Sequence, residues 1–133
     1  MKLETLIVDD DEMVVFLHKI AVAESGLSTK PVVAFNGNQA LDHISHQRGS
    51  GSAFLILLDI NMPELDGWEF LEAIQSLQET IFVVMVTSSV DSRDRNKSKT
   101  YKQVIDYVEK PLSINTCIQI KNLPQLANFV NNG

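Results

Sequence analysis

Five short apolar runs, separated by segments with helical spacing, constrain the fold of this chain more than any other feature. The runs span Leu3 to Val8, Pro31 to Phe35, Phe54 to Leu58, Ile81 to Val86 and Val104 to Val108. The first, third and fourth contain consecutive apolar residues, as do strands that helices cover on both faces. Strands that alternate with helices predict a doubly wound α/β fold with a parallel sheet and right-handed crossovers.

The connecting segments predict helices with different strength. In the first three, apolar residues recur at helical spacing: Val14, Leu17 and Ala21; Ala40, Leu41 and Ile44; and Phe70, Leu71, Ile74 and Leu77. The stretch 91–101 is polar, so a helix there depends on a cap at Asp91 or Ser92. A last helix is expected over 113–121, with Pro124 ending or kinking it.

Length and composition indicate one packed domain spanning 1–133. The chain has 44% hydrophobic and 21% charged residues, and its formal charge of −6 disfavours nucleic acid as a partner. The single cysteine, Cys117, excludes an internal disulfide. No secretory signal opens the sequence, and no apolar run is long enough to span a membrane. A cytoplasmic protein with no membrane contact is therefore expected.

Chemically active side chains follow four of the predicted strands. Asp9, Asp10 and Asp11 follow the first strand, Asp59 the third, Thr87, Ser88 and Ser89 the fourth, and Lys110 the fifth. In doubly wound sheets, ligands bind outside the carboxyl ends of the strands, so these groups are expected to converge. Clustered carboxylates need a counter-cation, and oxygen ligands suit Mg²⁺.

Each of these residues also has a simpler interpretation. The acidic triplet is equally consistent with a helix N-cap, because aspartate in a first turn is favoured by the helix dipole. Asp59 alone could be a solvated loop residue, and Lys110 alone a surface charge. Only their placement at the ends of different strands favours a common site.

A turn-rich loop follows Asp59 and ends at Gly67. Gly67 is expected to adopt a positive φ angle, and Asp66 to hydrogen bond to nearby backbone. Such a loop could direct a backbone carbonyl at a metal ion. The sequence leaves open whether the bond before Pro111 is cis.

The chain strongly resembles the receiver domains of bacterial two-component response regulators, of the stand-alone chemotaxis-regulator type. Four blocks carry the resemblance: Val8-Asp9-Asp10-Asp11, Leu57 to Pro63 with Asp66-Gly67, Val86-Thr87-Ser88, and Tyr107-Val108-Glu109-Lys110-Pro111. The resemblance covers essentially the whole chain. It implies a five-stranded, flavodoxin-like sheet of strand order 2-1-3-4-5.

The resemblance also implies a role for each site residue. Asp59 would be the phosphoacceptor, beside a Mg²⁺ ion held by Asp10, by an oxygen of Asp59, by the backbone carbonyl of Asn61 and, through a water, by Asp9. Lys110 would pair with the phosphoryl group. Thr87 would donate its hydroxyl, and Ser88 its backbone N–H, to phosphoryl oxygens. Asp11 would cap a helix.

The expected function is that of a switch. The phosphoryl group would come from a sensor histidine kinase or a histidine phosphotransfer protein, and its loss by hydrolysis would be tuned by Asn61 and Ser89. Tyr107 would follow Thr87 and change a face that binds a downstream protein. With no effector domain, the chain would act as a monomer or a phosphorylation-dependent dimer. It would not be an enzyme beyond its own phosphotransfer and autodephosphorylation.

Three alternatives have different sequence requirements. A phosphatase of the dehalogenase type needs a second acid two residues after its nucleophile, where this chain has Asn61. A receiver-fold binding module that acts without phosphorylation would not need the set Asp10, Asp59, Thr87 and Lys110. A flavin carrier would be repelled by the acidic triplet. The three histidines, His18, His43 and His46, flank no candidate site and are expected to pack or lie at the surface.

Overall fold

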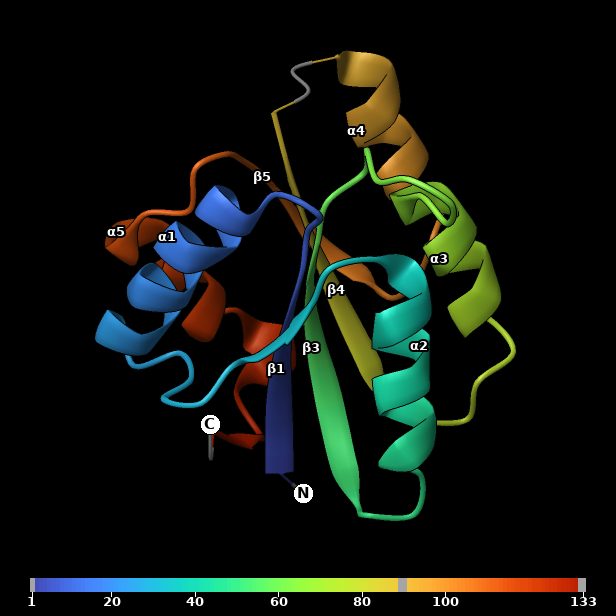
Figure 1. The fold of residues 1–133 in the computed structure, drawn as a ribbon. Helices are drawn as coiled ribbons and strands as arrows, with labels where there is room; N and C mark the ends of the chain where they lie inside the picture. The colour runs from blue at the N-terminus through green and yellow to red at the C-terminus, as the bar shows by residue number, and fades with distance from the viewer. Residues whose placement is uncertain (1, 89–90, 132–133) are drawn as a thin grey trace.

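The computed structural model describes residues 2–88 and 91–131 of the chain (Figure 1). Its strands are β1 (Lys2–Val8), β2 (Val32–Ala34), β3 (Ser52–Leu58), β4 (Ile81–Thr87), β5 (Val104–Glu109) and β6 (Val130–Asn131). Its helices are α1 (Glu12–Glu24), α2 (Gly37–His46), α3 (Gly67–Ile74), α4 (Ser92–Ser98) and α5 (Ile114–Lys121), followed by a 3-10 turn at Pro124–Leu126. All five predicted strands and all five predicted helices are confirmed.

The main sheet is parallel, with strand order β2-β1-β3-β4-β5. Helices α1 and α5 cover one face, and α2 and α3 cover the other, with α4 beyond them at the upper end in Figure 1. The predicted doubly wound, flavodoxin-like fold is therefore confirmed. Strand β6 was not predicted, because two residues carry no periodic signal; it pairs in parallel with Lys2 and Leu3 of β1.

The central strands are buried on both faces, as their consecutive apolar residues predicted. Residues 53–58 of β3 are all buried. Alternate residues of this strand join two separate core clusters, with Phe54 and Ile56 facing α2 and α3, and Leu55 and Leu57 facing α1 and α5. A sheet with two apolar faces and a helical layer on each holds its strand ends in a fixed arrangement.

Short polar side chains cap the helices near the carboxyl ends of the strands. The Asp11 side chain accepts hydrogen bonds from the amides of Met13 and Val14 at 2.9 and 3.2 Å. This confirms Asp11 as a helix cap. Asp91 caps the polar helix α4, and Ser113 caps α5. Caps supply partners for amides that a first helical turn leaves free, so even the weakly patterned α4 has a defined start.

The predicted inward face of α1 is shifted by one position. Val14, Leu17 and Ala21 were expected to face the core, yet Leu17 is exposed. The buried residues of α1 are Val15, His18, Ala21 and Val22. Both sets of residues have helical spacing, and the packing of α1 against the sheet and α5 determines which set is buried.

The loop after β3 contains a second difference. Gly67 was expected to have a positive φ angle, but within this loop that conformation belongs to Glu64, with φ 67°. Gly67 begins α3, where a Cβ atom would lie 2.6 Å from the Asp59 carbonyl oxygen and 2.8 Å from Ile60 Cα. A glycine is required here by close approach of the backbone. The predicted local bonding of Asp66 is confirmed, because Asp66 and Glu69 form a capping box.

Replacing Gly67 by Ala is therefore expected to lower the free energy of unfolding by about 1 to 3 kcal/mol, because backbone must move to admit the methyl group. Urea unfolding measures this loss. The amide NMR signals of Asp59 and Ile60 should shift at the same time. Gly49 is the control for a change without steric contact: its φ of 82° disfavours alanine, but a methyl group added there would meet nothing within 4 Å. Gly49→Ala should leave both amide signals in place; an equal shift in both variants would contradict the steric explanation.

Candidate functional site

Three carboxylates meet at the carboxyl ends of β1 and β3. Asp9 and Asp59 are buried, at 3% and 5% exposure, and Asp10 is exposed. The backbone fixes both buried residues, because the amide of Asp59 donates to Val8 O at 3.0 Å and that of Asp9 to Ala34 O at 3.1 Å. Ligand oxygens of the three side chains lie within 4.8 Å of one another. The predicted convergence of these acids is confirmed.

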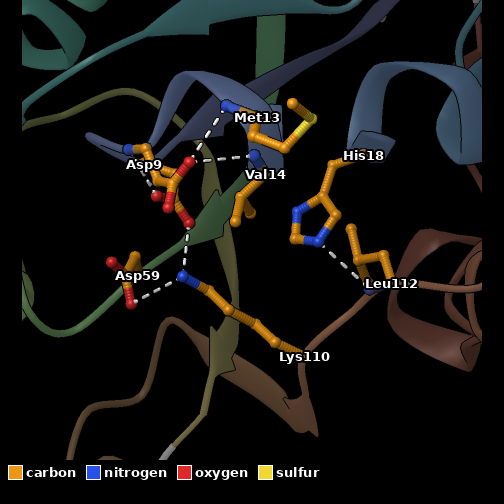
Figure 2. A network of polar contacts seen from close by, with 8 residues as sticks. Asp9, Met13, Val14, His18, Asp59, Lys110 and Leu112 are labelled. Carbon is orange, nitrogen blue, oxygen red and sulfur yellow. Dashed lines mark hydrogen bonds and ion pairs between the residues drawn. The ribbon is translucent and has the colours of Figure 1, made fainter. Parts of the chain in front are cut away.

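Lys110 brings a positive charge to the same point (Figure 2). Its Nζ atom lies 2.6 Å from Asp9 Oδ2 and 3.3 Å from Asp59 Oδ1. The backbone of Lys110 is held as well, since its amide donates to Thr87 O at 2.9 Å. Lys110 is followed by a cis peptide bond to Pro111. Lys110 is therefore a site residue, and the interpretation of an isolated surface charge is wrong.

The electrostatics of the site follow from burial and from these pairs. Burial raises the pKa of Asp59, and the charge of Asp9 raises it further, while Lys110 and the backbone of Asn61 act in the opposite direction. Burial by itself would lower the pKa of Lys110, but the carboxylates of Asp9 and Asp59 raise it overall. The raised pKa of Lys110 keeps it a cation at neutral pH, whereas folding disfavours the ionised form of Asp59.

The acidic cluster fits a divalent cation by the chemistry of its donors. All three side chains offer carboxylate oxygens. One of the three residues, Asp10, is exposed, so an ion could reach the cluster from solvent. Two buried acids share a single lysine, so the site favours additional positive charge. Hard cations such as Mg²⁺ take oxygen ligands and keep several waters, as this partly open cluster allows.

The remaining predicted residues surround this centre. Thr87 ends β4 and is fully buried, and Ser88 follows it at the surface. Asn61 is exposed, two residues beyond Asp59. Ser89, which was expected to tune hydrolysis, lies outside the described residues. The fold thus places Thr87 and Ser88 at the end of β4, which pairs with β3, the strand that Asp59 directly follows.

Tyr107 lies on β5, in the core that faces α2 and α3. Its side chain is 8% exposed, and the Arg95 guanidinium of α4 lies over the ring, 4.7 Å from its centroid. Tyr107 is therefore part of the core and also contacts α4 through Arg95.

The site has a neighbour that sequence reasoning missed. His18 was expected to flank no candidate site, but it is 2% exposed and its Nε2 atom accepts a hydrogen bond from the amide of Leu112 at 3.1 Å. Leu112 lies two residues after Lys110 (Figure 2). The sequence feature that could have predicted the burial of His18 is its helical spacing from Val15 and Val22. The other two histidines agree with prediction: His43 pairs with Glu4 and packs on Phe54, and His46 bonds to Asp42 O.

Large apolar side chains are exposed beside the site, on the faces of α1 and α5. Met13 and Phe16 are 66% and 58% exposed, respectively. The α1/α5 apolar patch, as it is called below, comprises Met13, Phe16, Leu17, Ile20, Ile114 and Ile118. Exposed apolar side chains gathered in this way are typical of protein-binding surfaces. Among the helices in the described ranges, none combines the length and apolarity needed to cross a membrane.

Comparison with known proteins gives a consistent result. A family model described as the response regulator receiver domain matches residues 5–121. A two-component response regulator of Arabidopsis thaliana, ARR22, is 33% identical over 111 residues, which make up 84% of this chain and 75% of that protein.

Solved structures agree in fold over nearly the same range. A two-component response regulator from Cytophaga hutchinsonii superposes with a TM-score of 0.82 at 28% identity, and the match covers 92% of this chain and 96% of that one. The bacteriophytochrome response regulator RtBRR superposes with a TM-score of 0.77 at 32% identity, covering 98% of this chain and 81% of that one.

Proposed function

The chain belongs to the response regulator receiver domain family of two-component systems, and on that premise we propose that it accepts a phosphoryl group on Asp59. The donor is a phosphohistidine of a sensor histidine kinase or of a histidine phosphotransfer protein. The observation that carries this proposal is the position of Asp59, a buried carboxylate placed between Asp9, Asp10 and the Lys110 ammonium.

The chemistry follows from the atoms at this point. A carboxylate oxygen of Asp59 attacks the phosphorus, a new P–O bond forms, and the P–N bond to the donor imidazole breaks with the electron pair leaving on nitrogen. The Lys110 ammonium, which lies 3.3 Å from Asp59 Oδ1, then binds a phosphoryl oxygen in place of that carboxylate oxygen. The Thr87 hydroxyl and the Ser88 amide donate to the other oxygens. Water later cleaves the acyl phosphate, returning Asp59 and inorganic phosphate.

The acidic cluster supplies the metal site of this proposal. Carboxylate oxygens of Asp9, Asp10 and Asp59 gather here. Asp10, Asp59 and the backbone carbonyl of Asn61 would hold Mg²⁺, and Asp9 would act through a water. Bound there, Mg²⁺ offsets negative charge on the phosphoryl oxygens. Asp9 then serves two partners, because it also holds the Lys110 ammonium.

The phosphoryl donor is proposed to dock on the α1/α5 apolar patch. The patch lies on α1 and α5, and α1 begins two residues after the exposed Asp10. A partner that presents an imidazole to Asp59 has to approach from this side, and apolar contact would hold it there. The downstream protein would bind a different surface, around α4 and β5, where Tyr107 contacts Arg95.

Intact mass spectrometry tests the phosphorylation proposal. The protein is incubated with acetyl phosphate, with Mg²⁺ or with EDTA. A single phosphoryl adduct that requires Mg²⁺ and disappears on standing is expected. No adduct under any condition would contradict the proposal and favour a binding module that acts without phosphorylation.

Trp68 offers a direct signal of the switch. It is the only tryptophan in the chain, it stacks on Tyr101 with centroids 6.3 Å apart, and Lys97 of α4 lies 4.5 Å from its ring centroid. If phosphorylation moves α4, this stack opens and Trp68 emission should shift to longer wavelength as water reaches the ring. Fluorescence during acetyl phosphate treatment measures the change. An Asp59→Asn protein should give none, and a shift that persists in that variant would contradict the link.

A further inference from the structure

His18 makes a long-range polar contact next to the site, and the proposed phosphotransfer does not use it. Its Nε2 atom accepts from the amide of Leu112, 94 positions away in the chain, and both residues are buried. Figure 2 shows the imidazole of α1 pointing at the turn that follows Lys110. A buried amide needs an acceptor, so this hydrogen bond is a specific connection between α1 and the turn. It is called the tie below.

The tie defines the protonation state of the ring. A backbone amide only donates, so Nε2 has to carry the lone pair and the proton of the neutral ring has to lie on Nδ1. Burial lowers the pKa of His18, Asp9 raises it and Lys110 lowers it, with a net decrease. The neutral acceptor form is therefore the one that burial favours.

The turn itself is held at two points. Upstream, the Lys110 amide donates to Thr87 O at 2.9 Å, which fixes the end of β5 against β4. Downstream, His18 holds Leu112 at 3.1 Å, immediately before the Ser113 cap of α5. Lys110 is the first of these two points, and its side chain extends from the turn toward Asp9 and Asp59 (Figure 2).

We propose that His18 is a positioning residue: by accepting from Leu112 it fixes the turn that places the Lys110 ammonium against Asp9 and Asp59. His18 does not touch the reacting atoms. Its effect on rate comes through Lys110, and that part of the inference rests on the proposed phosphotransfer at Asp59. The placement of Lys110 is a property of the unphosphorylated protein and stands apart from it.

Side-chain geometry provides a sharp set of variants. Glutamine places a carbonyl oxygen near the position of histidine Nε2, asparagine places its polar atoms near Nδ1, and leucine offers no acceptor. His18→Gln should therefore keep the tie, and His18→Asn and His18→Leu should lose it. Val15→Ala is the matched control, because Val15 lies in the same buried face of α1 and has no polar role.

The first readout is the rate of acetyl phosphate labelling with saturating Mg²⁺, at a temperature where urea titration shows every variant folded. His18→Leu and His18→Asn should slow labelling about tenfold, a moderate effect for a displaced catalytic group. His18→Gln should stay within about twofold of wild type, as should Val15→Ala. Normal labelling by His18→Leu, or equal slowing by all three His18 variants, would overturn the proposal.

The second readout does not depend on phosphorylation. The signal of the Lys110 ammonium is recorded by ¹⁵N NMR at one pH without divalent ions, together with hydrogen exchange of the Leu112 amide. In His18→Leu and His18→Asn the Lys110 signal should move and Leu112 should lose protection, while His18→Gln resembles wild type. If wild type is never labelled but these shifts occur, phosphotransfer is wrong and the positioning role stands. If labelling is normal and neither signal changes, the positioning role is wrong.

Discussion

Asp59→Asn is expected to lower incorporation of a phosphoryl group from acetyl phosphate by at least about 1,000-fold, the scale seen when a nucleophile is removed. The carboxamide has nearly the same shape and keeps the backbone contacts of Asp59, but its oxygen does not form a stable acyl phosphate. Intact mass with Mg²⁺ measures the adduct. Asp42→Asn is the control, since Asp42 is an exposed residue of α2, and it should label like wild type.

The same substitution should make the protein more stable at neutral pH. Burial and Asp9 raise the pKa of Asp59, so the fold disfavours its ionised form. An acid whose pKa is raised by folding contributes most stability below its unfolded value of 3.8, and that contribution is lost as pH rises through its folded value. Asp59→Asn removes the resulting cost at neutral pH.

We expect a gain of at least about 0.5 kcal/mol at pH 7, above the scatter of surface substitutions. The gain should shrink as the pH falls toward 4, where wild-type Asp59 becomes protonated in the fold. Urea unfolding of the two proteins across this range, without divalent ions, measures the difference. Undiminished labelling of Asp59→Asn would remove Asp59 as phosphoacceptor, and a stability loss at neutral pH would contradict the assigned electrostatics.

Lys110→Met is expected to be the most destabilising change at the site, by about 2 to 3 kcal/mol, because it leaves two buried carboxylates without their cation. The Lys110 side chain is 17% exposed, and those of Asp9 and Asp59 are 4% and 7% exposed. For a domain of this size the loss corresponds to a fall in Tm of roughly 6 to 12 °C. Labelling by acetyl phosphate should also slow by at least about tenfold, since the ammonium no longer faces the phosphoryl oxygens.

Mg²⁺ provides the diagnostic control for this variant. A divalent ion and the Lys110 ammonium both neutralise the negative charge of Asp9 and Asp59. Mg²⁺ should therefore raise the Tm of Lys110→Met more than that of wild type. Lys102→Met, at an exposed position, should have little effect with or without Mg²⁺. A Lys110→Met protein as stable as wild type, or one that responds to Mg²⁺ no more than wild type, would mean that the two charges are not coupled.

The local pattern of apolar and polar residues was sufficient to predict most of the fold. The consecutive apolar residues of β1, β3 and β4 indicated strands covered on both faces, and a parallel sheet then brings its carboxyl ends to one edge. Asp9, Asp59 and Lys110 directly follow strands of this sheet and Thr87 ends one, so their convergence could be predicted without coordinates. Strand β6 was beyond prediction, because its two residues pair with β1 through proximity alone.

Residue type and chain spacing were enough to predict which segments are strands, which side chains lie at their ends, and that oxygen donors and one ammonium meet. Features that depend on contact between distant segments became visible only in the folded protein. Helical spacing permits either Leu17 or His18 to face inward, and packing of α1 against the sheet chose His18, next to the turn at Leu112. Gly67 is likewise set by its approach to the Asp59 carbonyl. Such contacts carry no local pattern, because both partners are defined only when the layers pack.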